Sequence, residues 1–509
     1  MTSDNIYGLF ERRFPVDRNT TFIETDDGAT WSYADLERES ARYAQQFAGL
    51  GVVEGDRIAV QVEKSPQAVF LYLACLRAGF VYVPLNTAYV EAELDFFFAD
   101  AQPEVIVCAP AVQTVMSALA QRHGIRHVLT LGSDGDGSLI DSGMSPRFTT
   151  LDCAASDVAA ILYTSGTTGR PKGAMITHGN LTANAQVLHR VWDWRPNDVL
   201  LHILPLFHVH GLFVACHCVL LNGTGMLFMR SFDRPTLRRL LPRATVLMAV
   251  PTIYVRLLAD TEFDATDCRN MRLFISGSAP LHEQTFQDFR ARTGHSILER
   301  YGMTETGMIT SNPVAGPRVA GSVGLPLPGV SVRVVDDQNQ VVGLNEVGHL
   351  QVKGANVFSG YWCRPEISAE SFTRDGYFKT GDLARVDADG YLALVGRAKD
   401  LIITGGYNVY PKEVEAVIDA LDSVVESAVI GLPHADYGEM VSAVVLRDRA
   451  GEDLTEASLI ATLKRNLAGY KVPRRVFFVD ALPRNTMGKV EKNVLRARYA
   501  ALGSDNGAQ

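Results

Sequence analysis

The chain has 509 residues, enough for about three domains of ordinary size. Lys and Arg total 48 and Asp and Glu total 57, so the formal net charge is -9. Proteins that bind a nucleic-acid backbone are normally basic, and this balance therefore argues against that class. Hydrophobic residues (47%) and charged residues (21%) occur in the proportions of a folded globular protein rather than a disordered one. A pocket for a small anion needs only a few local cations and stays possible.

The N-terminus and the cysteines indicate the compartment. The first residues lack the basic and apolar segments of a secretory signal, and no uninterrupted apolar stretch approaches the ~20 residues of a membrane span. The seven cysteines are odd in number and lie mostly in apolar runs, which is typical of free buried thiols in a reducing compartment. We expect a soluble cytoplasmic protein. The cluster Cys216-His217-Cys218 lies in an apolar helical run that points the two thiols apart, which favours core packing over a metal site.

Short β-rich runs alternate with amphipathic stretches from about residue 56 to residue 300. Strands are expected at 56–62, 80–84, 158–163, 200–206, 245–250 and 271–276, and helices at 65–78, from an N-cap at Asn180, at 211–221, through 253–258 and at 281–292. Alternating β and α units predict an α/β fold in which helices cover a mostly parallel sheet. Ligands of such sheets bind outside the carboxyl ends of the strands.

The pattern changes after Pro328. Antiparallel hairpins are expected across 331–335 with 348–353 and across 384–386 with 391–395, and a small mixed pattern begins near residue 400. The sequence thus predicts parallel βα layers plus a β-rich subdomain over residues 1–396. A boundary at 397–400 and a small α+β C-terminal domain over 401–509 follow.

The strongest local motif comes directly after a predicted strand. Residues 163–173 read Tyr-Thr-Ser-Gly-Thr-Thr-Gly-Arg-Pro-Lys-Gly. The glycines let backbone N–H groups approach phosphate oxygens, and the hydroxyls add donors. The Walker A spacing is absent, and a flexible surface loop can share this composition. The predicted phosphate contacts are Thr164, Ser165, Gly166, Thr167, Thr168, Gly169 and Lys172.

Further motifs follow in a fixed order. They are Arg300-Tyr-Gly-Met-Thr-Glu-Thr306, Tyr377-Phe-Lys-Thr-Gly-Asp-Leu383, Gly396-Arg-Ala-Lys-Asp400 with Thr404-Gly-Gly-Tyr-Asn408, and Pro483-Arg-Asn-Thr-Met-Gly-Lys489. Taken singly, each polar residue is more simply a turn, cap or surface residue. Taken together and in this order, the motifs resemble the acyl-adenylate-forming superfamily, which includes acyl-CoA synthetases, firefly-type luciferases and peptide-synthetase adenylation domains. The resemblance covers almost the whole chain.

The resemblance implies roles for individual residues. The loop at 164–172 would hold the β- and γ-phosphates of ATP. The other implied nucleotide contacts are Thr304 at the α-phosphate, Glu305 at Mg²⁺, Tyr301 stacked on adenine opposite the backbone of Gly277, Ser278, Ala279 and Pro280, and Asp382 with Arg397 at the ribose. Lys489 would bridge the substrate carboxylate and the nucleotide, because cations are needed where two anions meet.

Lys489 belongs to the small domain and the phosphate loop to the large part, so the two meet only if the domains close. In the superfamily the small domain is mobile and rotates between the adenylation and thioester steps. The resemblance places the pivot at Lys399 and brings Gly405 and Gly406 towards the pantetheine of CoA in the second arrangement.

Specificity for the acid would be set by the acyl pocket. The segment Leu204-Pro-Leu-Phe-His-Val-His-Gly211 matches the pocket lining of the superfamily and places His208 near the carboxylate. Gly302 stands where acetate-specific relatives carry tryptophan. Arg256, Ser278 and Arg300 are candidates for binding a second carboxylate, which suits a guanidinium. Arg256 could equally be a surface cation that pairs with an acid one helical turn away.

This context resembles the malonyl-CoA synthetase branch. It implies an acid–thiol ligase that makes malonyl-AMP and pyrophosphate from malonate and ATP, with Mg²⁺, and then transfers malonyl to CoA, releasing AMP. The alternatives are a synthetase for methylmalonate or another short or medium-chain acid, a luciferase-type enzyme, a loader of a carrier protein and a non-catalytic nucleotide-binding protein. We expect small-molecule partners only, because the chain ends about 20 residues after Lys489 without an attached carrier domain.

Overall fold

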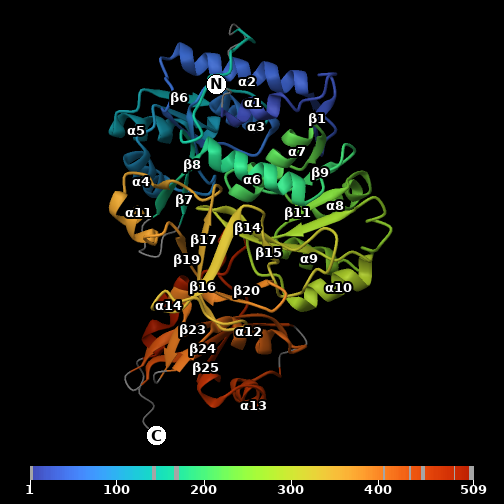
Figure 1. Cartoon of the computed structure of the whole chain (residues 1–509), viewed down its shortest axis with the longest axis vertical. Coiled ribbons are helices and arrows are strands. Elements are labelled where there is room, and N and C mark those ends of the chain that lie inside the picture. Colours follow the sequence, from blue (N-terminus) through green and yellow to red (C-terminus); the bar gives the residue numbers. More distant parts are fainter. Residues whose placement is uncertain are drawn as a thin grey trace.

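The computed structural model describes residues 4–139, 145–164, 171–404, 407–434, 437–448, 453–485 and 488–503. Figure 1 shows a large N-terminal part and a smaller C-terminal part at the two ends of the long axis. The strands coloured yellow and orange lie between them.

A nine-stranded sheet forms one layer of the large part. In spatial order its strands are β15 (Leu325–Pro326), β14 (Gly307–Ser311), β13 (Leu298–Met303), β12 (Leu273–Ser276), β11 (Val246–Ala249), β9 (Val199–His202), β10 (Gly225–Phe228), β1 (Thr21–Thr25) and β2 (Thr30–Ser32). The strands from β13 to β1 pair in parallel, and antiparallel strands close both edges. The predicted mostly parallel sheet is confirmed.

A seven-stranded sheet forms a second layer. Its order is β18 (Gly360–Tyr361), β8 (Lys172–Thr177), β7 (Val158–Thr164), β4 (Val81–Pro84), β3 (Arg57–Gln61), β5 (Val105–Cys108) and β6 (His127–Thr130). Strands β7 and β8 form an antiparallel hairpin, whereas β4, β3, β5 and β6 are parallel.

Helices cover and connect these sheets. They are α1 (Ile6–Glu11), α2 (Tyr33–Gly49), α3 (Pro66–Arg77), α4 (Glu91–Ala101), α5 (Gln113–His123), α6 (His178–Val191), α7 (His217–Asn222), α8 (Arg234–Leu240), α9 (Pro251–Leu258), α10 (Glu283–Thr293) and α11 (Pro365–Ser371). Every residue of α3 is buried, and one hydrophobic cluster joins it to strands of both large sheets. A helix that is apolar on all sides belongs in such a core.

The β-rich subdomain and the C-terminal part have sheets of their own. The first contains β16 (Val330–Val335), β17 (Gly348–Gly354), β19 (Phe378–Val386) and β20 (Leu392–Arg397). The second contains β22 (Tyr407–Val409), β21 (Ile402–Thr404), β24 (Gly438–Arg447), β23 (Val424–His434) and β25 (Arg475–Val479), packed with α12 (Pro411–Asp419), α13 (Glu456–Asn466) and α14 (Lys492–Gly503). The predicted boundary lies in the short turn Ala398–Asp400 between the two sheets.

Two local predictions need correction. The N-cap of α6 is Thr177, and Asn180 is the third helical residue, whose side chain closes a capping box with Thr177. The stretch expected as one α-helix from 211 to 221 begins as a π-helix, His210–Cys216, and continues as α7. Within the described part of the chain, no helix has both the length and the apolar character needed to span a membrane.

Candidate nucleotide and acyl site

The predicted phosphate loop is the connection of the β7–β8 hairpin. Thr164 pairs with Lys172 across the base of this hairpin. Lys172 places its ammonium 5.2 Å from the ring centre of Tyr361. The loop residues Ser165, Gly166, Thr167, Thr168 and Gly169 lie outside the described residues. The base of the loop therefore presents one hydroxyl and one cation to the neighbouring turn.

That neighbouring turn joins β13 to β14 and carries Thr304 and Glu305. Glu305 is buried and accepts hydrogen bonds from the hydroxyls of Thr164 (3.3 Å) and Tyr361 (3.0 Å). Burial raises the pKa of the Glu305 carboxyl, and the hydrogen bond from Tyr361 and the charge of Arg397 offset only part of the loss of water. A hard oxygen donor whose charged form lacks compensation suits Mg²⁺, which prefers carboxylate and phosphate oxygens. The residues present thus fit the metal that the motif implies.

The predicted ribose contacts come together on adjacent strands. Asp382 in β19 is opposite Arg397 in β20, and Arg397 Nε lies 2.6 Å from Asp382 Oδ1. The hydroxyl of Tyr301, in β13, donates to the other oxygen of the same carboxylate. Three residues from three motifs therefore form one buried cluster at the junction of two sheets.

The acyl side of the site follows the carboxyl ends of parallel strands. β9, β11, β12 and β13 all end at this edge, which is where open α/β sheets bind their ligands. The segment Gly277–Pro280 leaves β12 here, and Ser278 has a φ of +72°. A non-glycine residue in the left-handed region is strained and is found most often where function requires it. The hydroxyl of Ser278 lies 3.2 Å from Nδ1 of His210.

Arg300 is the buried cation of this region. Arg300 is only 3% exposed, and its Nε and Nη2 atoms have no hydrogen-bond partner among the described residues. Burial lowers the pKa of the guanidinium. A β-carbon added at Gly277 would lie 2.4 Å from Cζ of Arg300, so only glycine lets the guanidinium pack there. A buried cation without a carboxylate partner is costly and indicates an anionic ligand.

Two histidines lie beside this cation. Nδ1 of His208 accepts from the backbone N–H of His210 at 3.2 Å. Burial, followed by repulsion from Arg300, lowers the pKa of His208 to about 4 and that of His210 well below its usual range. Both rings are therefore neutral at pH 7. Nε2 of His210 is buried and has no partner among the described residues, so it can serve an additional ligand.

Arg256 has a different environment. It lies on the exposed side of α9, with its guanidinium 5.1 Å from the ring centre of Phe232. It does not belong to the buried group around Arg300. A direct contact with an acyl substrate would require its flexible side chain to leave the Phe232 ring, and the predicted role stays a prediction.

Lys489 approaches the ribose cluster from the small domain. Loss of water around its ammonium, followed by repulsion from Arg397, lowers the pKa of Lys489 to about 8. A β-carbon added at Gly488 would lie 3.4 Å from Cγ2 of Thr252 in α9, so this loop touches the large part. Lys399 is exposed in the turn Ala398–Asp400, and Gly405 and Gly406 lie outside the described residues.

Comparison with known families decides the membership of the chain. A family model described as AMP-binding enzyme matches residues 10–362, and one described as AMP-binding enzyme C-terminal domain matches residues 413–489. The chain belongs to the AMP-binding enzyme family. It is therefore a member of the acyl-adenylate-forming superfamily that its motifs resemble.

Curated relatives of this AMP-binding enzyme are named for different acids. A malonate–CoA ligase of Arabidopsis thaliana is 35% identical over 92% of this chain and 85% of that protein. A feruloyl-CoA synthase of an Amycolatopsis species is 36% identical over 93% of this chain and 94% of that protein. Identity at this level does not separate the acids, so the choice must be read from the pocket.

A solved relative is more similar. ATP-bound MatB from Rhodopseudomonas palustris is 51% identical, covers 99% of this chain and 100% of its own, and superposes with a TM-score of 0.96. Apo MatB from the same organism is 50% identical with the same coverage, but its TM-score is 0.84. At nearly equal identity the relative thus occurs in two overall shapes, and the present AMP-binding enzyme has the shape of the ATP-bound one.

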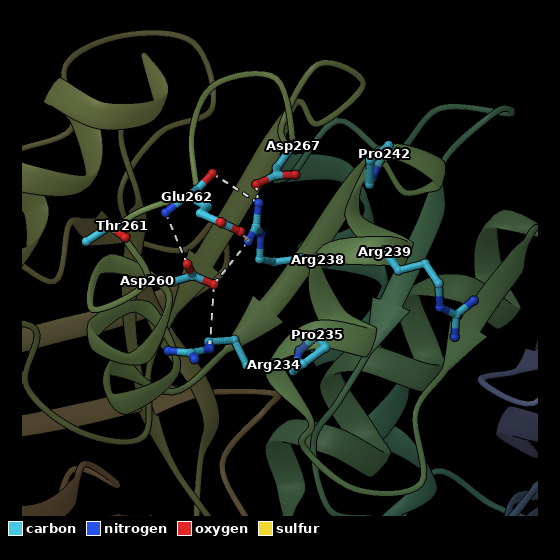
Figure 2. A pocket seen from close by; sticks show the side chains of 9 residues that line it. All are labelled: Arg234, Pro235, Arg238, Arg239, Pro242, Asp260, Thr261, Glu262 and Asp267. Atoms are coloured by element: carbon cyan, nitrogen blue, oxygen red, sulfur yellow. Dashed lines mark hydrogen bonds and ion pairs between the residues drawn. The ribbon is translucent and has the colours of Figure 1, made fainter.

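A separate hollow of about 750 Å³ lies between α8 and the segment after α9 (Figure 2). Its central cation, Arg238, contacts Asp260, Glu262 and Asp267 at 3.1–3.3 Å. The positive charge is matched by carboxylates of the protein itself. This hollow therefore lacks the uncompensated charge that marks Arg300.

Sequence reasoning missed two residues of the site in this AMP-binding enzyme. Tyr361 reaches Glu305 from β18, a two-residue strand that pairs with β8 and carries no recognisable motif. His210 was seen only as part of the pocket segment. The spacing His208-Val-His210 was a usable signal, because it places two imidazoles within three residues of the segment already expected to line the pocket.

Proposed function

We propose that this AMP-binding enzyme is a malonyl-CoA synthetase. It joins malonate to CoA through malonyl-AMP and releases AMP and pyrophosphate. The single observation that carries the choice of acid is the buried guanidinium of Arg300, which no carboxylate of the described chain neutralises. A second substrate carboxylate would supply the missing charge through a bidentate pair.

The neighbours of Arg300 support this position for the second carboxylate. Nε2 of His210 can donate to the same carboxylate, because the hydroxyl of Ser278 can donate to Nδ1 of this neutral ring and so fix its tautomer. A monocarboxylic acid would leave Nε2 of His210 and the guanidinium of Arg300 unpaired in the presence of bound substrate. Sites built for a polar substrate group reject analogues that lack it by up to ~10⁴-fold.

The chemistry of the first step follows from the other cluster. The reacting carboxylate must approach an α-phosphate that is also negative, so a cation between them lowers the barrier. Lys489 is placed for that role beside Asp382 and Arg397. Glu305 would hold Mg²⁺, which would neutralise phosphate charge when bound. Thr304 and the 164–172 loop would contact the phosphates.

The second step would need a different arrangement of the small domain. Lys399 lies in the turn between the two parts and is the proposed pivot. The Gly405–Gly406 segment would then approach CoA, and Lys489 would withdraw. The two overall shapes of MatB support such a change in this chain.

A panel of acids tests the proposed function. We expect AMP formation with CoA to be fastest with malonate, slower with methylmalonate and succinate, and lower by two orders of magnitude or more with acetate and octanoate. Initial rates at subsaturating acid give the comparison. A preference for octanoate would contradict the proposal and favour an apolar-chain synthetase. The absence of ATP–pyrophosphate exchange with every acid would favour a non-catalytic nucleotide-binding protein.

Arg256 allows a further prediction. If its guanidinium leaves Phe232 to contact the distal carboxylate, Arg256→Ala should lower kcat/KM for malonate by about 10-fold and leave butyrate unchanged, because only malonate carries the second charge. Rates with both acids measure the difference. Equal losses on the two acids would leave Arg256 a surface cation and assign the carboxylate to Arg300 alone.

A further inference from the structure

Helix α12 is the element of the small domain that lies against the large part at both of its ends. At its start, Lys412 donates to the carbonyl of Leu394, in β20, at 3.0 Å. At its end, Asp419 Oδ2 lies 3.7 Å from Nδ1 of His282, the residue before α10. Two contacts about two helical turns apart fix both the position and the direction of a helix.

The charge of Lys412 also acts on a buried carboxyl group of the large part. Glu299 in β13 is 6% exposed; its Oε1 accepts from the backbone N–H of Leu281 at 3.4 Å, and its Oε2 has no partner among the described residues. Burial raises the pKa of Glu299 to about 7, and the charge of Lys412 is the largest opposing influence. The cation that stabilises this carboxylate therefore comes from the other domain.

The second contact has the opposite polarity. Asp419 belongs to the small domain, its side chain is 10% exposed, and burial raises the pKa of its carboxyl to about 7. His282 belongs to the large part. The side chain of His282 makes no cap hydrogen bond to α10, so its contact with Asp419 is separate from helix capping.

The neighbours of Glu299 along β13 connect this interface to the active site. Successive residues of a strand face opposite sides, so Glu299 and Tyr301 point one way and Arg300 the other. Tyr301 donates to Asp382 of the ribose cluster, and the carboxyl of Glu299 is under the electrostatic influence of Lys412 in α12. A single strand thus carries residues of the acyl pocket, of the ribose cluster and of the region that faces the small domain.

We propose that Lys412, through the Leu394 carbonyl, and His282, through Asp419, are positioning residues, which hold α12, and through it Lys489, in the adenylate-forming arrangement. The inference rests on the proposed two-step function. Lys489 and α12 belong to one small domain, so leaving this arrangement breaks both contacts at once. The strength of the contacts then sets how often the domain leaves, and hence the balance between adenylate formation and thioester formation.

The test separates the two half-reactions in Lys412→Met, His282→Ala and Asp419→Asn. Pyrophosphate release without CoA measures adenylate formation, and CoA added to the preformed enzyme–adenylate complex measures discharge. We expect pyrophosphate release to fall about twofold to fivefold in each variant, as for a partly exposed charge contact. Discharge should stay constant or rise by a similar factor. In the double variant His282→Ala/Asp419→Asn, the rate of pyrophosphate release should fall no further than in the more affected of the two single variants, because the two residues act through one contact.

A second readout follows the domain directly. Cys363 is the one exposed cysteine and the other six are buried, so it provides a labelling site in the large part. Lys464→Cys on the exposed side of α13 provides a site in the small domain. We expect the fluorescence-transfer population of the ATP-bound arrangement to shrink in Lys412→Met and His282→Ala. The residue pair His349–Asp337, 2.9 Å apart within the large part, gives a matched control, and His349→Ala should change neither readout.

Equal losses in both half-reactions, or an unchanged transfer population, would overturn the proposal and leave ordinary destabilisation as the cause. If the unmodified protein releases no pyrophosphate with any acid, the proposed function fails. The ATP-dependent transfer population still tests the positioning role in that case.

Discussion

Replacing Arg300 with methionine is expected to lower kcat/KM for malonate by about 10²-fold and to raise the use of butyrate. Removing one partner of a buried charge pair costs about 3 kcal/mol, which is roughly two orders of magnitude. Methionine keeps the unbranched stem of arginine as far as the position of Nε and removes the charged end that packs against Gly277. Butyrate is close in size to malonate and places a methyl group where the second carboxylate would lie. Initial rates of AMP formation with both acids measure the change in preference.

The same substitution should leave thermal stability unchanged or raise it. Arg300 is charged and buried without a partner in the free protein, so its removal relieves a desolvation cost. Arg318→Met is a control for which we expect the opposite pair of effects. The Arg318 guanidinium donates to the carbonyls of Pro313, Ser296 and Val314, and its loss should reduce stability without changing acid preference. A variant at Arg300 that loses malonate and butyrate activity equally, or that unfolds at markedly lower temperature, would contradict the assigned role.

The order of elements in the fold could be predicted because it depends on local patterns. Alternating β-rich and amphipathic runs identified the parallel strands β9, β11 and β12, whose carboxyl ends contribute to the site. The hairpins of the β-rich subdomain followed from turn residues in the same way. The π-helix His210–Cys216 did not, because an extra residue in a helical turn leaves no mark on hydrophobic spacing.

The site residues that could be predicted from the sequence are those that belong to its motifs. Asp382, Tyr301 and Arg397 come from three separate motifs and lie in one cluster, as the resemblance implied. The sequence could not show which of Arg256 and Arg300 is the better candidate for binding the second carboxylate, since burial is a property of the tertiary structure. Arg300 is enclosed because Gly277, which directly follows β12, lets the backbone approach. The contact of His282 with Asp419 in α12 is equally invisible, because the partner lies more than a hundred residues away.

Adenylate formation is expected to lose about 10²- to 10³-fold in Lys489→Ala, since one preorganised contact to a developing charge is worth ~2.7–4 kcal/mol. The pH profile gives a sharper expectation. The pKa of Lys489 is lowered to about 8 in the free protein. The ammonium is therefore present below pH 8, and kcat/KM for pyrophosphate release should fall about tenfold per pH unit above it. Anionic substrates favour the charged form, so the corresponding limb of kcat should move to higher pH.

Lys489→Arg isolates the charge from the other properties of this position. A guanidinium stays protonated throughout the accessible range, so the alkaline limb near pH 8 should disappear even though the maximal rate falls through altered geometry. Discharge of the preformed adenylate by CoA should change little in either variant, because Lys489 is withdrawn in the proposed second arrangement. An alkaline limb that persists in Lys489→Arg would assign the titration to another group. Equal losses in both half-reactions of Lys489→Ala would show that the lysine stays at the site throughout the cycle, and that the small domain does not exchange it for the Gly405–Gly406 segment.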